Sequence, residues 1–532
     1  MDKVTISREE YTQLLELSAT VKSLQNYVSE LENTVNFLKE GLNLSRERAF
    51  GRSSEKLVYL EQLTIPDLFD EMEALSDPKL AEPKLEEVFS QVKSHQRKKR
   101  VSLQDSLPDD LPVIERYHTE LAGGPDCPQC GHELVKFGSR EYSHLMLVPS
   151  KAVVIKDITD VCKCVHCEAN GEKAVIKEAI CPCSVIPGSI ATAEAIAQIA
   201  TEKFVQATPL YRQEKYWERF GVKLSRQTMS NWLLRAAEDY LQPVYDRMCE
   251  QVVERDVLHA DETSLQVLRE EDKSPQSKSY MWLYRTSGDS EDALVLYRYE
   301  RDRKQIRPQK FLTNFHGYLH CDGYSAYHNL PDDVICVGCW SHLRRKLIDA
   351  KKAVGKSKSG SNLVNELLPY IEQLFLYEKV LKDKAPDERQ AERLLHEKPI
   401  AEQFFRRLEE ITVSEKSALG RAVAYAQGQK KYLMNFFLDG RLELTNNRAE
   451  RSIKPFVIGR KNFLFANTPR GARGSAIYYS LVETCKDNGI DPYAYLVSTI
   501  TGAAQLRDAG RQDEIADLTP AYFKKLNSGL SV

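Results

Sequence analysis

Two aspartates in this chain end apolar, strand-like runs in the same local pattern. Asp261 lies in the run VLHADET, two positions after His259. Asp322 lies in the run GYLHCDG, two positions after His320. Because side chains alternate along a strand, each histidine shares a face with the aspartate that follows it. If the two strands are neighbours, the carboxylates lie side by side, and oxygen ligands of this kind suit Mg²⁺ or Mn²⁺.

A third acid, Glu450, lies much later in the chain, in the run LTNNRAERSIK. Thr445 or Asn446 can cap a helix at this point, which places Glu450 in the first two turns of that helix. Lys454 follows four residues later on the same helical face, where it can hold a phosphate near a metal. The alternative is that each acid has an ordinary role, since strand-end aspartates often cap turns and helical glutamates are usually solvated.

Basic residues are concentrated around this third acid. Residues 441–474 hold eight arginines and lysines against two glutamates, although the net charge of the chain is only −3. The runs GRKNF and RGARG combine glycine with basic residues, and we expect them to be loops that approach a DNA backbone. The nearly neutral net charge argues against binding of nucleic acid over the whole protein surface. The hypothesis of DNA binding therefore rests on local basic surfaces. The candidate phosphate contacts are Lys454, Arg460, Lys461 and Arg451.

Five of the twelve cysteines cluster in one short stretch. Cys127 and Cys130 form one C-x₂-C pair, and Cys164 and Cys167 form a second. Four thiolates in two such pairs suit a structural zinc ion, which would close a small module without doing chemistry. The other interpretation is a set of buried free cysteines. Three further cysteines are alternative ligands: Cys162, Cys181 and Cys183.

The elements that must position these residues begin with a heptad repeat. Residues 14–42 carry valine or leucine at one seam position and leucine at the other, which favours a parallel two-stranded coiled coil and hence a homodimer or higher oligomer. A single amphipathic helix is the alternative. A proline-containing acidic linker follows and ends in the basic run KSHQRKKR, which either contacts phosphates or is simply solvated.

Residues 209–237 predict a helix, a turn and a second helix. Gly221 ends the first helix, and Ser225 can cap the second through its side-chain oxygen. This is the arrangement of a DNA-binding helical hairpin, although such hairpins also serve as plain packing units. The side chains expected to reach DNA are Arg226, Gln227, Ser230 and Asn231.

Five closely spaced strand-like runs follow residue 256, and the pattern is helical from about 341 to 436. Hydrophobic residues make up 42% of the chain, enough for several folded domains. No apolar run reaches the length of about 18 residues that suggests a membrane span. The polar N-terminal run MDKVTISREEYTQLL does not resemble a signal peptide, so we expect a cytoplasmic, nucleoid-associated protein and no membrane contact.

Further motifs are spread over nearly the whole chain: FGRSSEKL, CPQCG, PLYRQ, LSRQTMSNW, HCDGYSAY, CWSHLRRKL and the long block from GRLELTNNRAERSIKPF to DPYAYL. By these motifs the chain resembles the transposases of the bacterial insertion-sequence sixty-six family, the TnpC-type DDE enzymes. Arg448 departs from the family, which has proline at that place. The second cysteine pair reads CKCVHC, which leaves its ligands open among Cys162, Cys164 and Cys167.

The resemblance implies a multidomain α+β protein with an RNase-H-like α/β catalytic core, in which Asp261, Asp322 and Glu450 form a DDE triad. A helical insertion separates the last core strand from the helix of Glu450. The expected boundaries are 1–48 for the coiled coil, 49–110 for the linker with the basic run, 111–185 for the zinc-binding module, 186–250 for the helical, helix-turn-helix-like domain, 251–350 and 437–500 for the two parts of the core, 351–436 for the insertion and 501–532 for a C-terminal tail.

The same resemblance implies DNA transposition by metal-dependent cleavage and strand transfer. Two cations, Mg²⁺ or Mn²⁺, about 3.5–4 Å apart between the three carboxylates would activate a water and stabilise the leaving 3′ oxygen. The freed 3′ hydroxyl would then attack target DNA. The expected partners are transposon-end and target DNA, a second copy of the chain and small accessory proteins. His342, in the CWSH block, either lies near this site or is a packed helix histidine.

Two other functions fit the same residues. One is an RNase-H-like metal nuclease that hydrolyses DNA without joining it. The other is a catalytically inactive DNA-binding or scaffold protein that uses only the coiled coil and the zinc module. The presence of all three acids argues against the inactive protein.

Overall fold

The computed structural model describes residues 152–158, 160–163, 176–178, 184–354 and 361–528, together with Val21. Apart from Val21, the predicted coiled coil lies outside these residues, as do the linker with its basic run and the four predicted zinc ligands. A short antiparallel pair of strands, β1 (Val161–Lys163) and β2 (Ile176–Glu178), flanks the second cysteine pair in sequence. The exposed Cys162 lies on β1.

Helices precede the central sheet: α6 (Ala193–Phe204), α7 (Leu210–Glu218), α8 (Arg226–Ala236), the π-helical turn η2 (Ala237–Leu241) and α9 (Gln242–Val253). The predicted break between α7 and α8 is confirmed. Gly221 has φ +77°, a conformation that glycine adopts without strain. Ser225 caps α8, and its Oγ accepts a hydrogen bond from the N–H of Thr228 at 3.1 Å.

All five predicted strand runs form one mixed sheet in the order β5-β4-β3-β6-β7. The strands are β3 (Val257–Gln266), β4 (Lys278–Thr286), β5 (Val295–Glu300), β6 (Gly317–His320) and β7 (Val334–Val337). β4 is antiparallel to both of its neighbours, β3 and β5, whereas β3, β6 and β7 are parallel. Two short helices join these strands: α10 (Ile306–Phe311) and η3 (Ser325–Tyr327).

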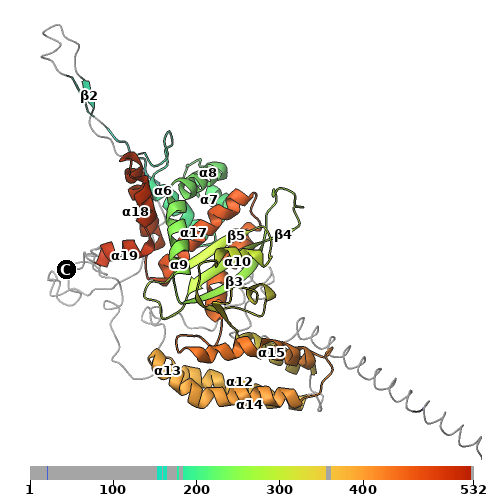
Figure 1. The fold of residues 1–532 in the computed structure, drawn as a ribbon. Coiled ribbons are helices and arrows are strands. Elements are labelled where there is room, and N and C mark those ends of the chain that lie inside the picture. Colours follow the sequence, from blue (N-terminus) through green and yellow to red (C-terminus); the bar gives the residue numbers. More distant parts are fainter. Residues whose placement is uncertain are drawn as a thin grey trace, which may run out of the picture. The chain divides into compact units, whose positions relative to one another are not determined.

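The C-terminal helices pack on this sheet: α16 (Asn447–Phe463), α17 (Pro469–Asp487), α18 (Pro492–Asp508), η6 (Gln512–Asp517) and α19 (Pro520–Ser528). α17 lies against the edge strand β5 (Figure 1). Thr484 Oγ1 accepts the N–H of Val295 at 2.9 Å, and Ser480 Oγ accepts the N–H of Tyr297 at 2.8 Å. α17 thereby covers the β5 edge of the sheet and closes it to pairing with another strand. The segment after residue 500, predicted as a tail, is helical as far as Ser528.

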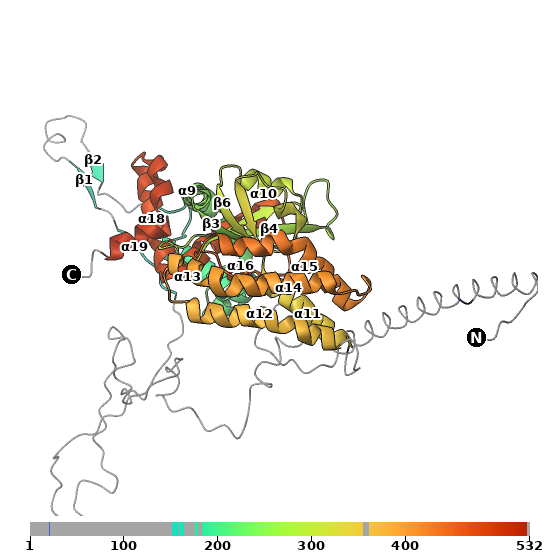
Figure 2. The same ribbon diagram turned by 60° about the horizontal axis from the view of Figure 1, so that its bottom comes forward.

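The helices between β7 and α16 pack around a second hydrophobic core, to which Val257 of β3 and Val337 of β7 also contribute. They are α11 (Trp340–Val354), α12 (Ser361–Leu381), α13 (Pro386–Glu392), the π-helical turn η4 (Arg393–Glu397), α14 (Lys398–Glu410), α15 (Ala418–Met434) and η5 (Asn435–Leu438). Figure 2 shows α11, α12, α14 and α15 side by side. Trp340, Ile371 and Phe404 are completely buried among them. The predicted change to helix after the last strand is therefore confirmed.

The glycine-containing basic runs are helical, and their prediction as loops was wrong. Gly459 lies inside α16 and Gly474 inside α17. A Cβ at Gly459 would lie 2.1 Å from the hydroxyl oxygen of Tyr479, and one at Gly474 would lie 3.0 Å from Leu234. These glycines permit close helix packing rather than turns. Among the helices that the structure describes, none has the length and apolar character needed to cross a bilayer.

Candidate active site

Asp261 and Asp322 lie on neighbouring parallel strands. Asp261 lies within β3, so its predicted place at a strand end was wrong, whereas Asp322 lies just beyond the end of β6 as predicted. The histidines two positions earlier pair with each other in register, so the adjacency that the sequence argument required is met. Main-chain N–H groups donate to both carboxylates, from Glu262 to Asp261 Oδ1 at 2.8 Å and from Tyr324 to Asp322 Oδ1 at 2.9 Å.

The surrounding acids act on Asp261 electrostatically. Burial and the carboxylates of Glu262, Asp322 and Glu450 raise the pKa of Asp261 well above its ordinary value. Burial and nearby negative charges both disfavour the ionised form of a carboxyl group. Asp261 is therefore within electrostatic range of both other predicted acids, and the site accumulates negative charge.

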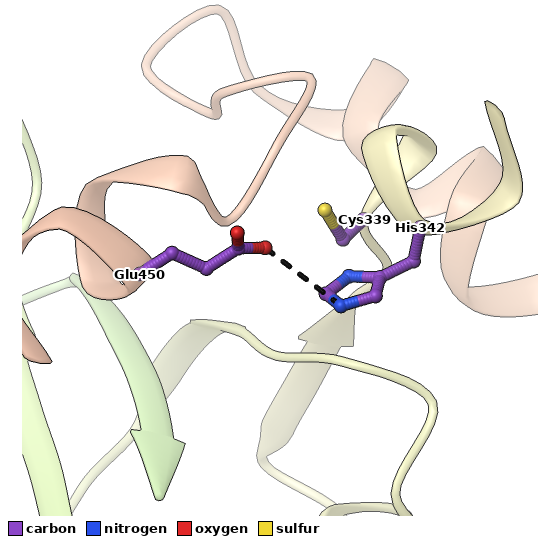
Figure 3. Close-up of side chains that lie close together, drawn as sticks. All are labelled: Cys339, His342 and Glu450. Atoms are coloured by element: carbon purple, nitrogen blue, oxygen red, sulfur yellow. Dashed lines mark ion pairs between the residues drawn. The ribbon is translucent and has the colours of Figure 1, made fainter. Parts of the chain in front are cut away.

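Glu450 lies in the first turn of α16, where the positive end of the helix dipole favours a carboxylate. Its Oε1 is 3.7 Å from Nε2 of His342 (Figure 3). Its Oε2 is 3.4 Å from Nη2 of Arg345. Oε1 is buried without a hydrogen-bond partner, although the side chain as a whole is 14% exposed. His342, for which the sequence left open a place near the site or a packed position on its helix, thus lies beside the third predicted acid.

Asn446 occupies the N-cap position of α16, but its side chain does not cap the helix as the sequence suggested. Its Nδ2 donates to the carbonyl oxygen of Ala260 at 2.8 Å. Its Oδ1 lies 3.0 Å from Nδ1 of His259 and accepts the proton of that nitrogen. These two contacts tie the start of the Glu450 helix to β3, one residue before Asp261. Sequence reasoning missed this role because the contacts join segments far apart in the chain.

The two site histidines support the sheet rather than face a ligand. The rings of His259 and His320 are stacked with centroids 4.2 Å apart and planes at 10°, and both side chains are fully buried. Nε2 of His320 accepts the main-chain N–H of Glu443 at 3.2 Å. Burial lowers the pKa of His259 to about 3, so this ring is neutral at physiological pH. A neutral stacked pair can lie beside the acids without adding charge.

Glu262 is a fourth acid near the site, and it was not predicted from the sequence. Its side chain is 1% exposed, and Arg303 binds it through Nε at 2.6 Å and through a second guanidinium nitrogen. The hydroxyl of Tyr327 donates to its other oxygen at 2.5 Å. Burial and the charge of Asp322 raise the pKa of Glu262. Its position directly after Asp261 was a visible signal, but the partners that neutralise it were not.

Cys339 lies immediately before α11, three residues before His342, and was not selected from the sequence. Ligand atoms of Cys339, His342 and Glu450 all lie within 4.8 Å of one another (Figure 3). Burial raises the pKa of the Cys339 thiol to about 11. In the part of the chain that the structure describes, Asp261, Asp322 and Glu450 do not converge this closely.

The four candidate phosphate contacts have different surroundings. Arg460 donates to Thr263 Oγ1 at 3.1 Å and Ser264 Oγ at 3.3 Å, so its guanidinium joins α16 to β3. Burial lowers the pKa of Arg460. Arg451 is exposed, whereas Lys454 and Lys461 are half-buried. These four residues place positive charge along the helix that carries the third acid.

The chain is similar to known proteins over most of its length. Residues 188–474 match the family described as Transposase IS66 family, and residues 480–521 match the IS66 C-terminal element. Residues 38–116 match a family described as Transposase C of IS166 homeodomain. Two relatives from Sinorhizobium fredii (strain NBRC 101917 / NGR234) are described as uncharacterized proteins. One, y4qI, is 33% identical over 414 residues, which cover 75% of this chain and 74% of the relative. The other, y4jD, is 28% identical over 390 residues, which cover 70% of this chain and 74% of the relative.

Proposed function

Because the chain belongs to the IS66 family of transposases, we propose that it cleaves the DNA ends of an insertion sequence and joins them to target DNA, with Asp261, Asp322 and Glu450 as its catalytic acids. One observation carries this assignment. Parallel pairing of β3 with β6 brings the two aspartates onto neighbouring strands, and the Asn446 contacts bring the helix of Glu450 to β3.

We further propose that the sheet and its C-terminal helices form an RNase-H-like core. Three antiparallel strands followed by two parallel strands, in the order β5-β4-β3-β6-β7, support this fold. The helices that follow β7 would be an insertion between the last strand and the helix of the third acid. The second hydrophobic core around which they pack agrees with an inserted unit.

The residues of the site fit divalent cations with a preference for oxygen ligands, Mg²⁺ or Mn²⁺, and we propose that two such ions bind there. Burial and the neighbouring carboxylates raise the pKa of Asp261, and a bound cation would offset this accumulation of negative charge. Glu450 Oε1, buried without a hydrogen-bond partner, is available to a cation. When bound, such ions acidify an attacking water and stabilise the leaving 3′ oxygen.

The protein's own groups position and neutralise the substrate in this proposal. Asn446 and His259 hold Glu450 beside β3, and Arg303 keeps Glu262 out of the reaction. The basic side chains of α16, namely Arg451, Lys454, Arg460 and Lys461, lower the cost of bringing phosphates toward the acids.

DNA recognition is proposed for the helices and modules that precede the core. Arg226, Gln227 and Asn231 are exposed on α8, whereas Trp232 and Leu233 are buried beneath it. One polar face free for DNA is what a recognition helix requires. The homeodomain description of the match over residues 38–116 supports DNA binding by the N-terminal part as well. A structural Zn²⁺ on Cys127, Cys130, Cys164 and Cys167 and a coiled-coil dimer remain predictions.

The test uses full-length protein, labelled insertion-sequence ends with their flanking DNA, and Mg²⁺. Asp261→Asn should lower end cleavage by roughly 10³-fold or more while leaving the unfolding midpoint nearly unchanged. Asp332→Asn changes an exposed aspartate outside the site and should cleave at the normal rate. Normal cleavage by Asp261→Asn would overturn the catalytic assignment. Cleavage without joining of pre-cut ends would favour the nuclease, and no cleavage by the native protein would favour the inactive scaffold.

A further inference from the structure

A second set of metal-binding groups overlaps the proposed catalytic site. Cys339 and His342 are three residues apart at the start of α11, so their side chains lie on one side of the helix. Glu450 reaches toward them from α16 (Figure 3). The ligand atoms of the three residues lie within 4.8 Å of one another.

We propose that Cys339, His342 and Glu450 form a site for a thiophilic divalent ion such as Zn²⁺, and that this ion inhibits the enzyme by withdrawing Glu450 from the catalytic acids. The binding half of this inference stands on the geometry alone. The inhibitory half rests on the proposed function.

The donor set distinguishes this site from one for Mg²⁺. One sulfur, one imidazole nitrogen and one carboxylate oxygen suit zinc, whereas magnesium avoids thiolate ligands. Bonds of about 2.0–2.3 Å in a tetrahedral zinc site separate neighbouring ligand atoms by roughly 3.3–3.8 Å. The 3.7 Å between His342 Nε2 and Glu450 Oε1 already lies in that range. Three protein ligands leave a fourth position for water.

The surroundings of the three groups support binding. Glu450 Oε1 is buried without a hydrogen-bond partner. The Cys339 side chain is buried, and its Sγ already accepts the main-chain N–H of Asn446 at 3.2 Å. A hydrogen bond of this kind stabilises a metal-bound thiolate. Binding would release the thiol proton to solvent. Arg345 opposes the ion through its positive charge, but it contacts Oε2 and leaves Oε1 available.

The first test measures Co²⁺ binding to full-length protein by its thiolate-to-cobalt absorption band. Cys339→Ser should lose one bound equivalent relative to the native protein, and Cys249→Ser, which changes a half-buried cysteine on α9, should lose none. Cys127 and Cys130 are expected to bind cobalt too, so the result is the difference between variants. Equal stoichiometry and equal spectra for native protein and Cys339→Ser would overturn the site. If Cys339→Ser fails to fold, His342→Gln is measured in its place. Loss of one equivalent of bound Co²⁺ would support the site, and an unchanged amount would overturn it.

The second test adds Zn²⁺ to cleavage reactions that contain Mg²⁺, with each protein compared to its own rate in Mg²⁺ alone. The native protein should be half-inhibited at a Zn²⁺ concentration at least tenfold lower than Cys339→Ser requires. Equal sensitivity would overturn the inhibitory role. If the native protein does not cleave in Mg²⁺, the proposed function fails, while the cobalt measurement still decides whether the site exists.

Discussion

Asn446 connects three parts of the site through one buried side chain and its main chain. Its amide joins Ala260 and His259, its N–H contacts Cys339, and its carbonyl oxygen accepts the N–H of Glu450 in the first turn of α16. Because it is only 1% exposed, water cannot replace these contacts if they are lost. The position of Glu450 relative to β3 therefore depends on this residue.

We predict that Asn446→Ala lowers both stability and activity. Two buried partners would lose their hydrogen bonds, at a cost of about 2–4 kcal/mol in the free energy of unfolding. End cleavage should fall further than the folded fraction does, because Glu450 is no longer held. Denaturant unfolding and cleavage rates measure the two effects. Asn447→Ala, at the next and less buried position, is the control, and an equal effect from both changes would contradict the role of Asn446.

Packing between helices explains two glycines at the scale of elements. Replacing glycine by alanine in a helix normally adds stability, by about 0.5–1 kcal/mol. At Gly459 the new Cβ would lie 2.1 Å from Tyr479 Oη, whereas at Gly428, in α15, it would meet no atom within 4 Å. The same substitution should therefore have opposite signs at the two positions.

Gly459→Ala should destabilise the protein by about 1–3 kcal/mol, because α16 and α17 must separate to accept the methyl group. Gly428→Ala should leave stability unchanged or raise it slightly. Chemical denaturation of the two variants under identical conditions provides the comparison. Stabilisation by Gly459→Ala would show that α16 and α17 do not pack as closely as described.

The π-helical turn η4 holds a buried acid that links stability to pH. Burial and the nearby carboxylate of Glu378 raise the pKa of Glu397 to about 8. Arg393 is paired with Glu378 at 2.7 Å and so offsets only part of this effect. An acid whose pKa is raised by folding stabilises the native state below its unfolded pKa and loses that contribution as pH rises through the folded value.

Stability should therefore fall between about pH 4.5 and pH 8 through Glu397, by at most about 1.4 kcal/mol for each pH unit. Glu397→Gln removes this titration and should be more stable than the native chain at pH 8, with the difference shrinking toward pH 5. Unfolding midpoints across this range test the prediction. A constant difference between the two proteins would assign the effect to another group.

At the scale of the whole molecule, the proposed processing of two DNA ends would require at least two copies of the chain. The heptad of residues 14–42 is the predicted means of association. Lysine in place of the seam residues Leu24 and Leu31 would put like charges opposite one another and oppose a coiled coil. Positions on the outer face of the helix tolerate charge. The two kinds of position can be tested with equal changes in charge.

Replacing Leu24 and Leu31 by lysine should lower the molecular mass in solution to that of a monomer, as measured by light scattering. Paired-end joining should fall with it. The matched control replaces Asn26 and Asn33 by lysine as well. These residues lie on the outer face of the same heptads, so this variant should keep the native mass. An unchanged mass for the leucine variant would rule out the coiled coil as the contact between copies.

The sequence by itself determined the local elements and the residues at their ends. Short apolar runs at close spacing predicted all five strands, because such runs must be buried whatever they pack against. Gly221 and Ser225 predicted the break before α8, since a positive φ and a helix cap are properties of single residues. The same local pattern correctly placed Asp322 at a strand end, but it was wrong for Asp261, which lies within β3.

Only the tertiary structure decided what depends on partners distant in the chain. Gly459 and Gly474 were predicted to lie in loops. They lie in helices, where the missing side chain permits close contact with Tyr479 and Leu234. Asn446 was a predicted helix cap, but its side-chain amide donates a hydrogen bond to β3. Cys339 became a candidate metal ligand only because the fold places it beside Glu450. Periodicity and capping depend on residues within a few positions, whereas these contacts join residues from 20 positions apart, for Gly459 and Tyr479, to 240 positions apart, for Gly474 and Leu234, which no local pattern encodes.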